Sequence, residues 1–234
     1  MYQFSIALEN LQSCTYGISN WELRDGFFGA DLAEMTPGQV EDARDLLIRK
    51  LSRVVLYTTD LHVAEYSAFV RFFRNAHLLG IVHVCLSSTA LAGATDEQIK
   101  AIIGIGESFS IGVLFQMEAE SMDAFNFDRY AQLRAENTGL VFSPNAFIKA
   151  GIRPYTQVLS KTKFAWDIRF LRVEDLQQDP QMPVALLKGN SELKECASKL
   201  LTRTFHGYFA FAPYGTGEYM DRIIDSFAEV LCAM

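Results

Sequence analysis

The feature that most constrains the fold of this sequence is a regular alternation of short, β-rich apolar runs with longer amphipathic runs. Eight runs have the length and composition of strands: residues 3–8, 20–24, 53–60, 81–88, 112–118, 139–145, 167–175 and 207–214. Helical patterns lie between most of them or follow them, at residues 36–51, 64–80, 95–109, 126–139, 190–205 and 217–234. Repeated strand–helix alternation predicts parallel strands joined by right-handed crossovers.

This pattern predicts a single closed (β/α)8 TIM barrel that spans residues 1–234, because eight strands are the number such a barrel needs. An open doubly wound sheet is the alternative, but no strand is followed by a Gly-rich nucleotide-binding fingerprint. The connection between the first two strands is too short for a full helix, so we expect a compact α/β barrel with a short or missing first helix. No linker, repeat or low-complexity segment divides the chain.

Several helix boundaries are marked by their residue types. Thr36 is a candidate N-cap, and Pro37 stands at the first helical position, where its missing N–H costs nothing. Gly80 and Gly139 are predicted C-caps, since glycine adopts the left-handed conformation that often ends a helix.

Composition excludes several classes of protein. The net charge is −7 and no basic stripe is present, which disfavours a nucleic-acid surface. No apolar run approaches the roughly 18 residues of a membrane span, and the N-terminus lacks the basic start of a signal peptide. The four cysteines lie far apart, without metal-ligand spacing. We therefore expect a soluble cytoplasmic protein with neither nucleic-acid nor membrane partners. The Phe-rich helix over 69–80 is either core packing or the face of a homo-oligomer.

A string of motifs runs across most of the chain: "NWELR" at 20–24, "LVFSPNAF" at 140–147, "FLRVED" at 170–175 and "GYFAFAP" at 207–213. In this order they resemble the second-, sixth-, seventh- and eighth-strand motifs of the xylose-isomerase-like TIM barrels. That family includes sugar isomerases and epimerases and the endonuclease IV type. The resemblance implies that the protein takes part in carbohydrate metabolism.

The resemblance also implies where a divalent metal would lie. The family holds it with a Glu on strand five, an Asp on strand six, a His on strand seven and a Glu on strand eight. In this sequence these positions are occupied by Glu118, Ser143, Arg172 and Ala212. A methyl group cannot ligate a cation, and a guanidinium repels one. We therefore expect no metal and no other cofactor at this place.

Glu118 and Arg172 are the candidate catalytic residues that the resemblance leaves. Strands five and seven contribute side chains to the same interior layer of such a barrel, so the two charges are expected to face each other and to pair. As an isomerase or epimerase, the protein would use Glu118 as the base and Arg172 to stabilise the enediolate oxygen. The second proton transfer would then fall to Glu22 or Glu174.

Other polar residues are predicted to line the C-terminal mouth and to bind the substrate: Glu22, Arg24, His62, Ser143, Asn145, Glu174, Lys188 and Tyr214. A structural ion pair is the alternative role for Glu22 and Arg24. Gly215, Thr216 and Gly217 before the last helix form a weak candidate phosphate site, for which ordinary helix capping by Thr216 is the alternative. The segment from Lys188 to Asn190 has the same two interpretations, with Asn190 as the cap.

Two functions of different classes remain open from the sequence. The first is a sugar or sugar-phosphate isomerase or epimerase that acts on a small polyhydroxylated ligand. The second is a non-catalytic ligand-binding or regulatory barrel derived from such an enzyme. Family resemblance favours the first, and the three changed metal positions favour the second.

Overall fold

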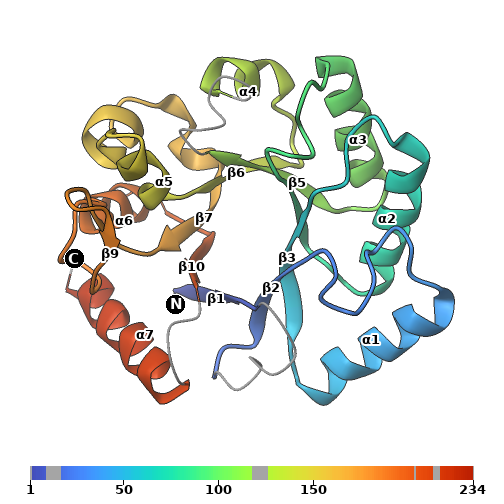
Figure 1. Ribbon diagram of the computed structural model, residues 1–234, viewed down its shortest axis with the longest axis horizontal. Coiled ribbons are helices and arrows are strands. Elements are labelled where there is room, and N and C mark those ends of the chain that lie inside the picture. Colours follow the sequence, from blue (N-terminus) through green and yellow to red (C-terminus); the bar gives the residue numbers. More distant parts are fainter. Residues whose placement is uncertain (1, 9–16, 118–125, 203, 213–216, 234) are drawn as a thin grey trace.

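Eight parallel strands close into a barrel in the order β1-β10-β7-β6-β5-β4-β3-β2 (Figure 1). The computed structural model describes residues 2–8, 17–117, 126–202, 204–212 and 217–233, with the side chains of 217–219 left out. The barrel strands are β1 (Gln3–Ala7), β2 (Asn20–Arg24), β3 (Arg53–Thr59), β4 (His83–Leu86), β5 (Gly112–Met117), β6 (Thr138–Phe142), β7 (Ile168–Val173) and β10 (Tyr208–Phe211). The prediction of a single closed barrel topology is confirmed.

Helices surround the barrel as an outer ring (Figure 1). They are α1 (Pro37–Arg49), α2 (Tyr66–Leu78), α3 (Asp96–Ser108), α4 (Phe127–Leu133), α5 (Pro144–Lys149), α6 (Leu193–Leu201) and α7 (Gly217–Cys232). Thr36 caps α1 in a capping box with Gln39, as its residue type predicts. The connection from β1 to β2 contains no helix among its described residues, 8 and 17–19. None of the described helices is both long enough and apolar enough to cross a membrane.

Two sequence-based boundaries are wrong. Gly139 does not end α4, which stops at Leu133; it lies inside β6, where an added Cβ would be 2.9 Å from the carbonyl oxygen of Asp167. The strand predicted to reach Asn145 stops at Phe142, because Pro144 opens α5 at its first position. Gly80, by contrast, follows α2 with a positive φ of 69°, as a C-terminal glycine should.

The chain on either side of β7 contains elements that the sequence pattern did not predict. We call the long connection after β7, residues 174–192, the excursion. A two-stranded antiparallel hairpin pairs β8 (Leu176–Gln177) with β9 (Met182–Pro183). Two short turns precede β7, the π-helical η3 (Pro154–Leu159) and the 3-10 helix η4 (Lys163–Asp167). Each has only two to six residues, too few for a repeated apolar spacing, which is why periodicity missed it.

The barrel has two separate apolar cores. The larger one lies between the strands and the outer helices. The smaller one fills the barrel interior with side chains from six strands: Val55, Leu56, Cys85, Leu114, Val141, Phe170, Tyr208 and Ala210. The interior is therefore solid at mid-height, and polar side chains are confined to its two ends.

Candidate functional site

A buried ion pair crosses the interior just above the inner core. Arg172 on β7 donates a hydrogen bond through Nη1 to Oε2 of Glu22 on β2. Only 3% of the Glu22 side chain and 18% of the Arg172 side chain are exposed. Ser5 on β1 donates to the other oxygen of Glu22 at 2.5 Å. Both carboxylate oxygens are therefore satisfied, as burial of a charge requires.

The sheet register explains how this pair forms between strands that are not neighbours. Arg172, Ala210 and Ser5 occupy one row across β7, β10 and β1, and Ala7 lies beside Glu22 on β2. Small side chains on the two intervening strands leave room for the long arginine to reach Glu22. Burial works to lower the pKa of Arg172, but the negative charges of Glu22 and Glu174 outweigh it and raise the pKa above its usual value.

A second polar pair stands beside the first. Ser143, which follows β6, donates to Oε1 of Glu174, which follows β7, at 2.6 Å. Ser143 is buried with 7% exposure, whereas Glu174 is half-buried. Within the described residues, Oε2 of Glu174 accepts no hydrogen bond. The two pairs together form what we call the mouth cluster: Ser5, Glu22, Ser143, Arg172 and Glu174.

The mouth cluster gives Arg172 a carboxylate partner that the sequence did not predict, Glu22. Arg172 does enter the interior from β7, but its carboxylate partner among the described residues is Glu22. Glu118 lies outside the described residues, so its predicted contact with Arg172 stays a prediction. Glu22 and Arg24 do not pair with each other; Arg24 is exposed and lies 3.7 Å from Asp60.

Two predicted mouth residues, Asn145 and His62, form hydrogen bonds within the chain. Asn145 is buried and its Oδ1 accepts a 2.5 Å hydrogen bond from Ser191, which ties α5 to the excursion after β7. His62 has both ring nitrogens engaged with loop backbone: Nε2 contacts the Ala92 carbonyl at 2.7 Å, and Nδ1 accepts from the Ala64 N–H. The Oδ1 atom of Asn145 and both ring nitrogens of His62 are therefore engaged within the chain.

Asp175 is the important residue that sequence reasoning did not single out. It is 2% exposed, and its carboxylate accepts from the backbone N–H groups of Leu176, Gly189 and Ser191 at 2.9, 2.8 and 3.2 Å. We call these three hydrogen bonds the Asp175 knot. They close the excursion against the end of β7 and hold the neighbouring Glu174 at the mouth. A carboxylate directly after the strand motif "RVE" was the available signal.

The Asp175 knot also involves the segment from Lys188 to Asn190, for which a phosphate site and a helix cap were the two interpretations. The Gly189 N–H is already donated to Asp175, and Lys188 is exposed at the surface of the excursion. Asn190 does not cap α6, because its Oδ1 accepts from Gln178, and the N-cap residue is Glu192. Of the candidate phosphate segment before α7, only the backbone of Gly217 is described; Tyr214, Gly215 and Thr216 lie outside the described residues.

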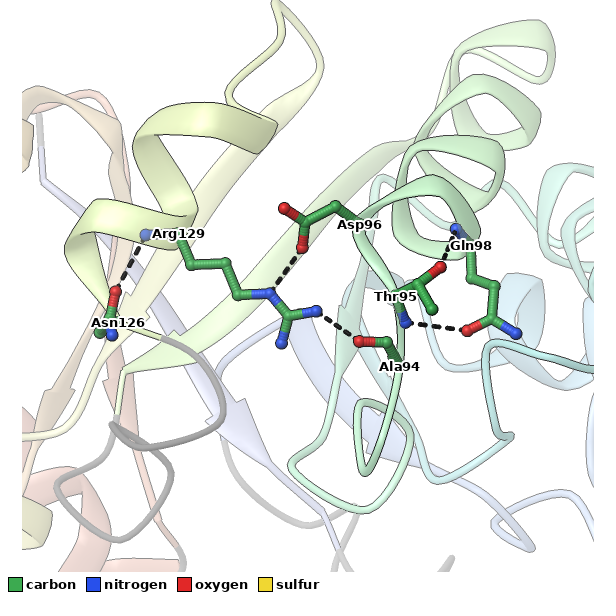
Figure 2. A network of polar contacts seen from close by, with 6 residues as sticks. All are labelled: Ala94, Thr95, Asp96, Gln98, Asn126 and Arg129. Carbon is green, nitrogen blue, oxygen red and sulfur yellow. Dashed lines mark hydrogen bonds and ion pairs between the residues drawn. The ribbon is translucent and has the colours of Figure 1, made fainter.

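A further network anchors the start of α4 to α3 (Figure 2). Arg129 donates through Nε to Asp96 at 2.7 Å and through Nη2 to the carbonyl of Ala94. Asn126 caps α4 by accepting from the Arg129 N–H, and Thr95 caps α3 in a capping box with Gln98. These contacts hold the start of α4 against the start of α3.

Three described side chains stand at positions where the resemblance predicts metal ligands, and these three do not suit a divalent cation. Ser143 already donates its hydroxyl to Glu174, and Arg172 places a guanidinium where a neutral histidine would be needed. Ala212 offers only a methyl group. Within the described ranges, no three His, Cys, Asp or Glu side chains converge in a way that could hold a metal ion.

Several solved structures share the fold of this chain. A xylose isomerase domain protein from Planctomyces limnophilus superposes with a TM-score of 0.74 at 10% identity, covering 98% of this chain and 96% of that one. A D-tagatose 3-epimerase-like protein gives 0.73 at 14% identity, with coverages of 99% and 98%. A xylose isomerase-like barrel from Mycobacterium smegmatis in complex with magnesium gives 0.72 at 12% identity, with coverages of 94% and 87%.

The matched structures are xylose isomerase-like barrels, sugar phosphate isomerase/epimerases and endonuclease IV, which is the family that the sequence motifs resemble. At these identities the likeness establishes the fold alone. No family model and no curated protein matches this sequence.

Proposed function

We propose that this barrel binds a small polyhydroxylated ligand, a sugar or a related polyol, at its C-terminal mouth without a divalent metal. The observation that carries the proposal is the buried Glu22–Arg172 pair. It places a fixed, paired arginine at a position where the related fold would hold a metal ligand. Arg172 donates one of its five N–H groups to Glu22 and stays partly exposed, so it keeps donors for ligand oxygens.

The mouth cluster offers donors and acceptors side by side. Glu174 has an oxygen without a described hydrogen bond, and it lies close enough to Arg172 to raise the pKa of that guanidinium. A hydroxyl group both donates and accepts, so neighbouring hydroxyls of a polyol match an adjacent carboxylate and guanidinium. The position also fits the general rule that ligands of (β/α)8 barrels bind at the C-terminal ends of the strands.

The test is calorimetric titration of the full chain with pentoses, hexoses, inositols and their phosphates. We expect at least one of them to bind equally well with chelator and with added magnesium or manganese. Replacing Arg172 by glutamine should weaken that binding by about tenfold or more, because a charge-assisted hydrogen bond is lost. Arg49→Gln on α1, an exposed position away from the mouth, is the matched control. Binding that disappears with chelator would contradict the proposal.

Glu174 favours isomerase or epimerase chemistry as a second candidate function. A carboxylate with one unused oxygen beside a guanidinium can take the proton from a carbon next to a carbonyl group while the cation stabilises the enediolate oxygen. Glu118, predicted at the end of the fifth strand, would then exchange the proton on the other face of the sugar. Glu22 is less suited to this role, since both its oxygens are engaged.

Solvent exchange distinguishes catalysis from binding. In heavy water, an isomerase or epimerase would place deuterium on the carbon next to the carbonyl group of its ketose or aldose, which NMR detects directly. We expect exchange with the ligand that binds in the titration, and its loss in Glu174→Gln with binding retained. A ligand that binds but exchanges no proton would leave the protein as a non-catalytic binding barrel.

A further inference from the structure

A hollow of about 220 Å³ opens at the opposite end of the barrel, where the strands begin. We call it the basal pocket. It is lined by the first residues of β4, β5, β6 and β10 and by Arg169 near the start of β7. The inner apolar core, which includes Leu114 and Phe170, lies between it and the mouth cluster. The two polar ends of the barrel are therefore separate sites.

Two glycines give the side chains of His83 and Arg169 room at this end of the barrel. An added Cβ at Gly112 would lie 2.6 Å from Cδ2 of His83, and one at Gly139 would lie 2.7 Å from Cγ of Arg169. His83 and Arg169 therefore lie across neighbouring strands in the space that those side chains would fill. At about 30 Å³ for each water, the pocket has room for about seven waters, enough for a tetrahedral oxyanion.

Arg169 brings an uncompensated charge into this pocket. Its side chain is half-buried, yet it forms no ion pair or hydrogen bond with any residue that the structure describes. The hydroxyl of Tyr208, a residue 7% exposed, likewise makes no hydrogen bond in the described chain. Burial raises the pKa of Tyr208 more than the charge of Arg53 lowers it, so the hydroxyl keeps its proton and can donate.

His83 supplies an acceptor rather than a third donor. Its Nδ1 lies 3.0 Å from the carbonyl oxygen of Val55, and because a carbonyl only accepts, Nδ1 carries the hydrogen. Burial lowers the pKa of His83, the hydrogen bond to Val55 opposes this, and the charge of Arg169 lowers the pKa further. The ring is therefore neutral at pH 7, and Nε2 presents a lone pair.

We propose that the basal pocket binds a singly protonated phosphoryl oxyanion, either inorganic phosphate or the phosphoryl group of a small phosphomonoester. Arg169 and the Tyr208 hydroxyl donate to its unprotonated oxygens, and its P–OH group donates to Nε2 of His83. Glu136 lies at the rim, exposed, and opposes the anion from a solvated position. Screening by solvent and salt makes its repulsion weaker than the attraction of the half-buried Arg169.

Equilibrium dialysis of the full chain against radiolabelled inorganic phosphate near neutral pH tests this site. We expect Arg169→Gln to weaken binding by about tenfold or more. Glu136→Gln should strengthen binding, because it removes only repulsion. Arg49→Gln is the control for a general effect of arginine and should bind as the native chain does. Glycerol phosphate in place of inorganic phosphate, compared at about pH 6 where roughly half of the phosphomonoester keeps one proton, identifies the source. Tighter binding assigns the pocket to a phosphomonoester, and weaker binding assigns it to the free ion.

Two further readouts locate the ion and check the role of His83. Phosphate should shift the imidazole NMR signals of His83 and leave those of His62, near the other end of the barrel, unchanged. Sulfate carries no proton at neutral pH and would face the Nε2 lone pair, so it should bind about tenfold more weakly. Equal binding of sulfate, an unchanged affinity in Arg169→Gln, or a shift confined to His62 would each overturn the proposal.

Discussion

Replacing Arg172 by methionine should destabilise the fold by about 3 kcal/mol, because it leaves the Glu22 carboxylate buried with only the Ser5 hydroxyl as a described partner. Replacing Glu22 by leucine should cost a similar amount, since the guanidinium then lies in the interior without its counter-charge. The double variant removes both charges and leaves apolar side chains of similar volume. It should be more stable than either single variant. Urea unfolding of the four proteins measures the coupling.

Arg24→Met is the matched control for this cycle. Arg24 lies on the same strand face as Glu22, but its side chain is 66% exposed and its nearest carboxylate, on Asp60, is 3.7 Å away. An exposed pair of this kind contributes little, so we expect a change within about 0.5 kcal/mol. Strict additivity of the two buried single changes would show that Glu22 and Arg172 do not interact in solution.

Replacing Asp175 by alanine should cost about 3 kcal/mol or more. The change removes the acceptor of three backbone N–H groups, those of Leu176, Gly189 and Ser191, in a site that is 2% exposed. Asp175→Asn should cost less, because an amide oxygen can keep the two bonds made to Oδ1 and loses only the bond from Gly189. Thermal and urea unfolding measure both.

The Asp175 knot should also affect the mouth, because Glu174 is its immediate neighbour. We expect Asp175→Ala to weaken ligand binding at the mouth even under conditions where the variant is fully folded. Asp45→Ala on α1, an exposed aspartate, should change stability by less than about 0.5 kcal/mol and leave binding unaltered. If Asp175→Ala behaves like Asp45→Ala, the knot does not hold the excursion.

The sequence by itself determined the barrel. The period of the apolar pattern changes between strand and helix along the whole chain, and these local periods place every barrel strand within a few residues of its observed range. The motifs also predict that Ser143 and Arg172 stand where the family that they resemble holds metal ligands, and this correspondence stays a prediction. Such information is local, since it depends only on a residue's place in its own strand.

The pairing of charges was decided only by the tertiary structure. Which carboxylate meets Arg172 depends on the order of strands around the barrel and on their register, which places small residues on β10 and β1 between Arg172 and Glu22. The knot around Asp175 and the basal pocket have the same origin. The Asp175 knot joins residues up to 16 positions apart through backbone N–H groups, and the basal pocket brings together residues of five strands. Neither feature leaves a periodic trace in the sequence.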